Sequence, residues 1–227
     1  VNGGDITSTG AIGYSGTPTL TISGTGNLGG ASTLTAYDLQ INGTQTAAGT
    51  ITADNSIDVG AGATFTTTGE NVNVDGSFTT TSTGIIDCSG ATGTVTMTAG
   101  GTLGGGSGAI TFCDLATTTT GTTNFSGSGT NTVNSDVSVG TDTTLNLNST
   151  ISITGSLTNS TNGVIGYSGT PVVTVQGTSI GGGTTGAVSF YDLVKSGAGA
   201  TTFSNGGTNT IANDLDVQAG TFNINSN

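Results

Sequence analysis

The stretch "GVIGYSGTPVVTV", residues 163–175, joins a short turn-rich segment to a run of β-branched residues. Two earlier stretches match it, "GAIGYSGTPTLTI" at residues 10–22 and "GIIDCSGATGTVTM" at residues 84–97. In all three, small polar residues alternate with apolar ones toward the end. This period of two is typical of half-buried strands. Recurrence at a fixed spacing indicates a tandem repeat.

Further landmarks recur in the same order along the chain. The motif Ala36–Leu39 is matched by Phe112–Leu115 and Phe190–Leu193, and Ile57–Val59 is matched by Val137–Val139 and Leu215–Val217. The landmarks lie roughly 76 residues apart, as is expected for a repeat architecture. The sequence therefore predicts one repeat domain over residues 1–227, with repeats over about 10–83, 84–162 and 163–227.

The composition favours an all-β fold built from short strands. Glycine is abundant, with 42 residues, and only two prolines occur. Turn residues rich in Gly, Asn, Ser and Thr recur every eight to ten residues, and no apolar stripe of helical period is present. We expect a right-handed parallel β-solenoid of about nine coils, three of about 25 residues in each repeat. The alternative is three tandem small β-sandwich modules.

A longer segment carries a resemblance to known proteins. Residues 190–225, "FYDLVKSGAGATTFSNGGTNTIANDLDVQAGTFNIN", resemble the degenerate repeats of extracellular parallel β-helix proteins of bacteria and archaea, such as autotransporter-like adhesins. The resemblance implies a right-handed parallel β-helix. It also implies a cell-surface protein, because these adhesin-like repeats occur outside the cell.

The two cysteines occupy repeat positions that hold tyrosine elsewhere. Cys88 matches Tyr14 and Tyr167, and Cys113 matches Tyr37 and Tyr191. If each pair lies one coil apart, equivalent positions are ~4.8 Å apart, which falls within the Cα range of a disulfide. We expect a Cys88–Cys113 disulfide and two stacked tyrosine pairs; two free buried thiols are the alternative. A disulfide favours an oxidising, extracellular location.

The charged residues exclude several classes of function. The chain has thirteen acids, one Lys or Arg, no histidine and a net charge of −12. Such a chain lacks the basic groups that neutralise nucleic-acid phosphates. Histidine-dependent nucleophile pairs and histidine metal sites are absent from it as well. We predict no catalytic, cofactor or metal site, no nucleic-acid partner and no membrane insertion, and so not an enzyme.

The two ends of the sequence suggest how the solenoid is used. After residue 227 the pattern calls for a segment like "ISITGSLTNSTNG" at 151–163, and residues 1–9 resemble the end of that segment. We expect residues 1–9 of one subunit to complete repeat three of its neighbour by strand-edge complementation, with Val1, Ile6, Phe222 and Ile224 at the interface. The expected function is a subunit of an extracellular filament, with a rise of roughly 43 Å for nine coils. The alternative is a stalk segment of a larger cell-surface adhesin.

Other candidate features concern modification and ligands. Four Asn-x-Ser/Thr sequons are candidate glycosylation sites; they begin at Asn42, Asn124, Asn148 and Asn159. Glycans or the surfaces of host or neighbouring cells are candidate partners of the filament. The aspartates that precede leucine in each repeat, Asp38, Asp114 and Asp192, are expected to bond the backbone at turns.

Overall fold

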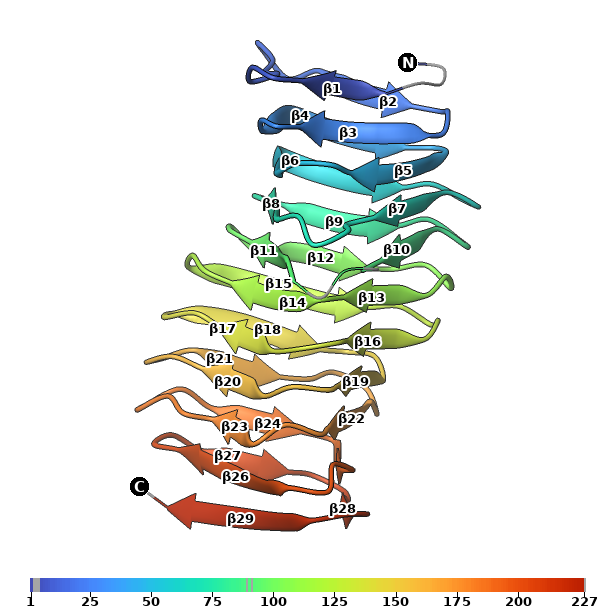
Figure 1. The fold of residues 1–227 in the computed structure, drawn as a ribbon. Coiled ribbons are helices and arrows are strands. Elements are labelled where there is room, and N and C mark those ends of the chain that lie inside the picture. Colours follow the sequence, from blue (N-terminus) through green and yellow to red (C-terminus); the bar gives the residue numbers. More distant parts are fainter. Residues whose placement is uncertain (2–4, 89, 91, 227) are drawn as a thin grey trace.

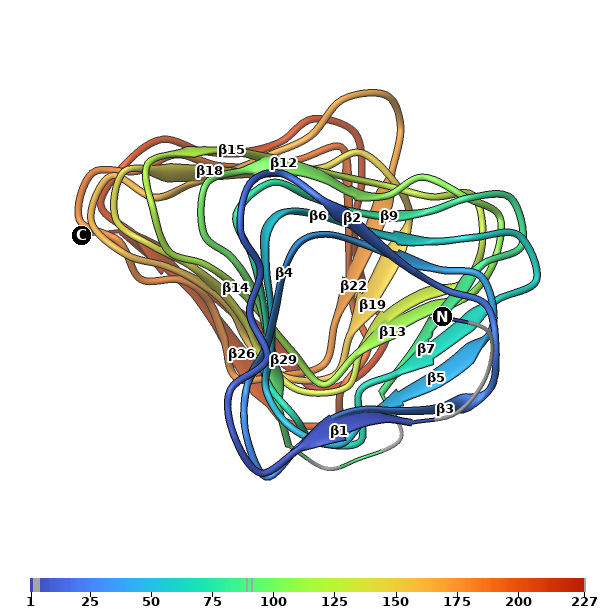
Figure 2. The same cartoon turned by 90° about the horizontal axis from the view of Figure 1, so that it is seen from above.

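The chain forms a right-handed parallel β-solenoid, as the sequence predicts. The structure is a computed structural model that describes residues 1, 5–88, 90 and 92–226. The described residues contain strands and turns and no helix. All strand pairs are parallel, and the coils stack along one axis (Figure 1). Viewed along this axis the cross-section is triangular, so each coil contributes a strand to each of three faces (Figure 2).

Face A is the eleven-stranded sheet, and it lies at the same side of every coil. Its strands are β1 (Ile6–Ser8), β3 (Gly26–Gly30), β5 (Thr44–Ala47), β7 (Thr64–Thr66), β10 (Ile85–Asp87), β13 (Ile110–Phe112), β16 (Asn131–Val133), β19 (Ile151–Ile153), β22 (Val172–Val175), β25 (Asp192–Lys195) and β28 (Leu215–Val217).

Faces B and C form one sheet, because β4 (Leu34–Ile41) and β6 (Ile51–Val59) bend round the corner between them. Face B holds the first parts of β4 and β6, then β8 (Val72–Val74), β11 (Thr94–Met97), β14 (Asp114–Thr117), β17 (Val137–Val139), β20 (Leu157–Asn159), β23 (Ser179–Gly181), β26 (Ala200–Asn205) and β29 (Thr221–Ser226). Face C holds β2 (Thr19–Ile22), the second parts of β4 and β6, then β9 (Ser77–Thr80), β12 (Gly101–Gly104), β15 (Gly121–Ser126), β18 (Thr143–Leu147), β21 (Val164–Gly166), β24 (Val188–Phe190) and β27 (Asn209–Ile211).

Alternation along each strand builds the core. In β11, Val95 and Met97 point inward and are buried, whereas Thr94 and Thr96 face outward. Inward side chains stack on their parallel partners in the next coil, as Phe65 does on Ile86. Rings on different faces of one coil also meet, since Phe65 and Phe78 are 6.0 Å apart between centroids. Burial of this continuous apolar column supplies the main stabilising free energy, since isolated coils have no closed core of their own.

The coils are shorter than the predicted 25 residues. Parallel partners on face A are separated by 19 residues between Leu28 and Ala47 and by 24 between Ile86 and Ile110. The solenoid therefore makes about ten turns, not nine. The prediction of coil length was wrong because it used the tyrosine and cysteine pairs as a ruler, and these lie on outward corner loops whose lengths differ from coil to coil.

The sequence repeat does not contain a whole number of coils. From β11 to β22, the matching strands of repeats two and three, the chain advances eleven strands. From β2 to β11 it also advances eleven positions, since β4 and β6 each supply two. With three strands per turn, each repeat spans three and two-thirds turns. Matching strands therefore lie on different faces: β2 on C, β11 on B and β22 on A.

Candidate functional site

The three residue pairs predicted from the repeat all form, one at each corner of the triangle. The Cys88 and Cys113 Cα atoms are 5.5 Å apart, and the two sulfurs form a disulfide at the A–B corner. The pair therefore joins two consecutive coils at the place where face A has its longest separation, 24 residues. The sequence prediction of a disulfide is confirmed.

The tyrosine pairs lie at the other two corners. Tyr14 and Tyr37 meet edge-to-face at the B–C corner with ring centroids 6.0 Å apart. Tyr167 and Tyr191 do the same at the C–A corner, 6.1 Å apart. This T-shaped geometry is favourable for aromatic rings. Because each repeat is rotated by a third of a turn, the same sequence motif closes each corner once.

Tyr14 makes a further contact across two coils. Its phenol donates a hydrogen bond to an Asp54 carboxylate oxygen, at 2.5 Å. This hydrogen bond, followed by desolvation and the negative charge of Asp54, raises the pKa of Tyr14 to about 12. The neutral phenol is the form that the folded chain stabilises.

The C-terminal edge of the solenoid exposes apolar side chains. In the part of the chain that the structure describes, β28 pairs with β25 and β29 pairs with β26, each on one side only. Leu215, Val217 and Ile224 are 40%, 43% and 69% exposed. In contrast, Leu193, the face-A neighbour of Leu215, is fully buried. The predicted interface residues Phe222 and Ile224 both lie on this edge.

The N-terminal edge carries the other predicted interface residues. Val1 is 58% exposed, and its amino and carbonyl groups bond the backbone of Thr21 and Ser23. Ile6 in β1 is only partly buried. Ile12 makes a single parallel bridge, to Leu34. This edge therefore has one partly buried apolar side chain on each face, Ile6 on A, Ile12 on B and Leu20 on C.

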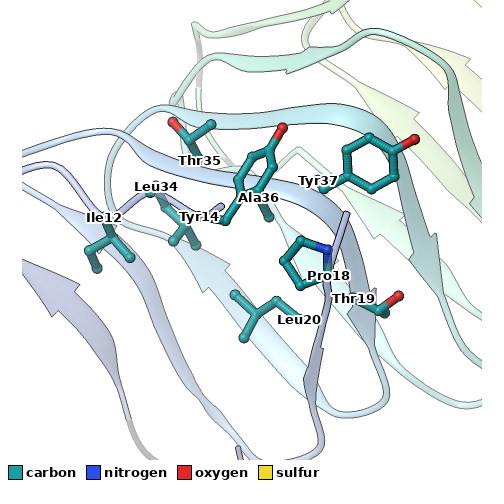
Figure 3. Close-up of a pocket in the computed structure, with 10 residues that line it drawn as sticks. Ile12, Tyr14, Pro18, Thr19, Leu20, Leu34, Thr35, Ala36 and Tyr37 are labelled. Atoms are coloured by element: carbon teal, nitrogen blue, oxygen red, sulfur yellow. The ribbon is translucent and has the colours of Figure 1, made fainter. Parts of the chain in front are cut away.

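A cavity of about 230 Å³ opens beside Ile12 at this N-terminal edge (Figure 3). Its walls come from the first two coils, and Leu20, Leu34, Pro18 and the Tyr14–Tyr37 pair line it. The lining is mostly apolar, so the cavity is an uncovered part of the solenoid core and its corner.

The repeated aspartates bond polar groups of the next coil, as expected. An oxygen of Asp114 accepts a hydrogen bond from the backbone N–H of Asp136, at 2.9 Å, and Asp192 accepts one from Asp214, at 3.0 Å. In repeat one, Asp38 accepts hydrogen bonds from the side chains of Asn55 and Ser56 instead. These carboxylates tie successive coils together on the outer surface.

Lys195 is a feature that sequence reasoning missed. This single basic side chain is fully buried and donates hydrogen bonds to the carbonyl groups of Gly197 and Ala219. Its place in β25, two residues after the inward-facing Leu193, shows that it points into the core. Lysine is almost never fully buried in proteins. The sequence did carry a signal for this burial: inward and outward positions alternate along β25, and Lys195 falls on an inward one.

The four sequons differ in accessibility. Asn42 is exposed, and Asn124 and Asn148 are half-buried. Asn159 is 6% exposed, and its amide donates hydrogen bonds to Gly163 and Asn205 in the interior. Asn159 falls on an inward position of β20, so a glycan there would have to replace these interior hydrogen bonds.

The described residues show neither a metal cluster nor a membrane-spanning helix, and comparison with known proteins finds no relative. Among the described residues, no group of three or more His, Cys, Asp or Glu side chains is placed to hold a metal ion. Over the same residues, no helix is long and apolar enough to cross a membrane. No family model, no curated protein and no solved structure matches this chain. The resemblance to extracellular β-helix repeats stays a prediction from the sequence.

Proposed function

We propose that this chain is a structural subunit of an extracellular filament, in which solenoids stack head to tail through their open edges. The observation that carries the proposal is the C-terminal edge, where inward-facing residues of β28 and β29 lie exposed. Exposed strand edges with apolar side chains are templates for pairing with another strand. A contact between two different edges of the same molecule propagates without closing and yields a fibre.

The turn count supports stacking of identical units. The strands supply thirty-one positions with β4 and β6 counted twice, and the Ile12 segment and the Val1 segment, which bonds β2 on face C, bring the total to thirty-three. Thirty-three positions are eleven turns at three positions per turn. A second copy that continues the solenoid therefore meets face A with face A, face B with face B and face C with face C. With one or two repeats per unit, the faces would be displaced by part of a turn.

The disulfide supports the extracellular part of the proposal. Disulfides persist in oxidising compartments and are rare in the cytosol. The Cys88–Cys113 bond joins neighbouring coils and closes a loop of 25 residues. Such a bond suits a fibre that has to keep its coils stacked outside the cell.

The test is the assembly state of the purified 227-residue chain at micromolar concentration. Negative-stain electron microscopy and sedimentation velocity are expected to show unbranched fibres one solenoid wide. Ile224→Asp places a charge on the exposed edge and is expected to leave a folded monomer, because burying an unpaired carboxylate is costly. Asn225→Asp adds the same charge at the next, outward position of β29 and is the matched control; it is expected to form fibres. A dispersed wild-type monomer would overturn the proposal.

The stalk of a larger cell-surface adhesin is the second candidate. The same open edges favour it, since a further coil of one longer polypeptide would cover them as well. The two candidates differ in one outcome: a stalk segment stays monomeric as an isolated 227-residue chain, and a filament subunit does not.

A further inference from the structure

In the proposed filament, β28 of one subunit would pair with β1 of the next. Because the sequence repeats, the same strand pair already occurs twice inside the chain; these two internal pairs are called the covered copies. β28 matches β17 and the second part of β6, and β1 occupies the repeat position of β20 and β9. In the covered copies, Val137 pairs with Leu157, and Ile57 pairs with Phe78. Both copies have the same register, so the repeat itself specifies how the uncovered copy pairs.

A second strand pair is repeated in the same way. β29 matches β18 and β7, and the segment around Ile12 matches β21 and β10. Leu145 of β18 pairs with Ile165 of β21, and Phe65 of β7 pairs with Ile86 of β10. Phe222 occupies the position of Leu145 and Phe65 in β29.

From these templates we infer that the subunit interface is a third copy of both strand pairs, in one fixed register. Leu215 and Asp216 of one copy pair with Ile6 and Thr7 of the second copy on face A. On face B, Phe222 and Asn223 of the first copy pair with Ile12 and Gly13 of the second. The inference rests on the proposed function and adds the partner, a second copy of this chain, and the residues that meet.

The space beside Gly13 fits this register. At Gly166, the matching position of repeat three, an added Cβ would lie 2.6 Å from the Asn146 side-chain oxygen of the preceding coil. At Gly13 an added Cβ would meet no described atom within 4 Å. Asn223 occupies the repeat position of Asn146. The inferred register therefore places Asn223 of one copy against Gly13 of the next, as Asn146 lies against Gly166.

Hydrogen bonds from backbone N–H groups to carboxylates at both ends of face A connect through the same register. Asp192 accepts the backbone N–H of Asp214, and Asp5 accepts that of Asn27, at 2.9 Å. Asp136, the repeat-two match of Asp214, accepts the N–H of Ser156 at 2.7 Å. In the inferred register Asp214 stands opposite Asp5 of the second copy. The Asp214 carboxylate then receives a backbone N–H, and these hydrogen bonds connect across the interface.

An outward contact in one of the two internal copies, on face C, agrees with the pairing inferred for face A. In the covered copy formed by β6 and β9, the Thr79 hydroxyl donates a hydrogen bond to Asp58, at 2.9 Å. Asp216 and Thr7 occupy these two repeat positions, and both are exposed in the single chain. We expect the Thr7 hydroxyl of the second copy to donate to the Asp216 carboxylate.

Cysteine cross-linking of the 227-residue chain tests the register. In the double variant Thr7→Cys/Asp216→Cys, the inferred register puts the two Cα atoms of adjacent copies about 5 Å apart, within disulfide range. Oxidised fibres are expected to give a covalent ladder on a non-reducing gel that dithiothreitol collapses. The control, Thr9→Cys/Asp216→Cys, keeps the same outward side but shifts by two residues, to about 8 Å, and is expected to stay unlinked.

The outcomes separate the two proposals. Fibres that link through position 9 or through neither position overturn the register and leave the filament standing. A chain that forms no fibres in wild-type form overturns both. Linking through position 7 alone, in fibres seen by electron microscopy, is the result that the inference requires.

Discussion

Gly13 and Gly166 hold the same place in repeats one and three, but their surroundings differ. Gly166 lies in β21, which pairs with β18 on the side of the preceding coil. Gly13 follows Ile12, which has one isolated bridge on the side of the following coil. The same local sequence is thus seen once inside the solenoid and once at its edge. One copy of the motif is paired on the side of the preceding coil and the other is not, and in the proposed filament a second copy supplies that missing partner.

The largest expected effect on stability comes from truncating Leu193 or Leu215, which are parallel partners on face A, one in the core and one at the C-terminal edge. In an Ile224→Asp background, which holds the chain monomeric, Leu193→Ala is expected to lower the free energy of unfolding by about 2–5 kcal/mol, since it leaves a core cavity. Leu215→Ala, 40% exposed in the single chain, is expected to lower it by less than about 1 kcal/mol. Urea unfolding followed by circular dichroism measures both. Equal losses would show that the edge is already covered in the monomer.

The second prediction concerns the corner that carries the disulfide. Cys88→Ser/Cys113→Ser is expected to lower the free energy of unfolding by about 3 kcal/mol, because the unfolded chain regains the freedom of a 25-residue loop. Cys88→Tyr/Cys113→Tyr installs the pair found at the other two corners. It is expected to recover about 1 kcal/mol relative to the serine variant through aromatic contact. If the tyrosine variant is no more stable than the serine variant, the three corners are not equivalent.

The third prediction uses the two glycines directly. Gly166→Leu is expected to cost about 1–3 kcal/mol of unfolding free energy, since the new side chain displaces Asn146. Gly13→Leu meets open space and is expected to leave the monomer within about 0.5 kcal/mol of its parent. The same Gly13→Leu change, in the chain that otherwise assembles, is expected to suppress fibres. Normal fibres from Gly13→Leu would contradict the placement of Asn223.

The smallest expected effect is the titration of Tyr14. Its pKa of about 12 lies above the ordinary value of 10, so folding favours the protonated phenol. The resulting stabilisation is fully present below pH 10 and is lost as the pH rises toward 12. The difference in absorbance at 295 nm between wild type and Tyr14→Phe reports this group. Asp54→Asn is expected to lower the Tyr14 pKa; an unchanged midpoint would show that Asp54 does not cause the shift.

The sequence was sufficient to predict the parallel solenoid and the residue pairs, because alternation and matched landmarks report directly on strands and on contacts between coils. Coil length was not readable, since Cys88 and Cys113 lie on a corner loop in the longest coil. Alternation places Lys195 and Asn159 on inward positions, but the hydrogen-bond partners that allow their burial required the structure. A polar residue is normally expected to face water. These two face the interior, and hydrogen bonds to groups at the corners take the place of hydrogen bonds to water.

The axial rise of the fibre tests the central claim most directly. If β1 of the next copy stacks on β28, the eleven face-A strands of each subunit at ~4.8 Å predict a rise of about 53 Å, with the strand spacing unbroken across each junction. Cryo-electron microscopy of fibres from the 227-residue chain measures this value. A rise of about 53 Å with continuous coil density is the predicted result. Fibres with a different rise, or with a gap in the coil stack between subunits, would contradict the claim that the repeat continues from one copy into the next.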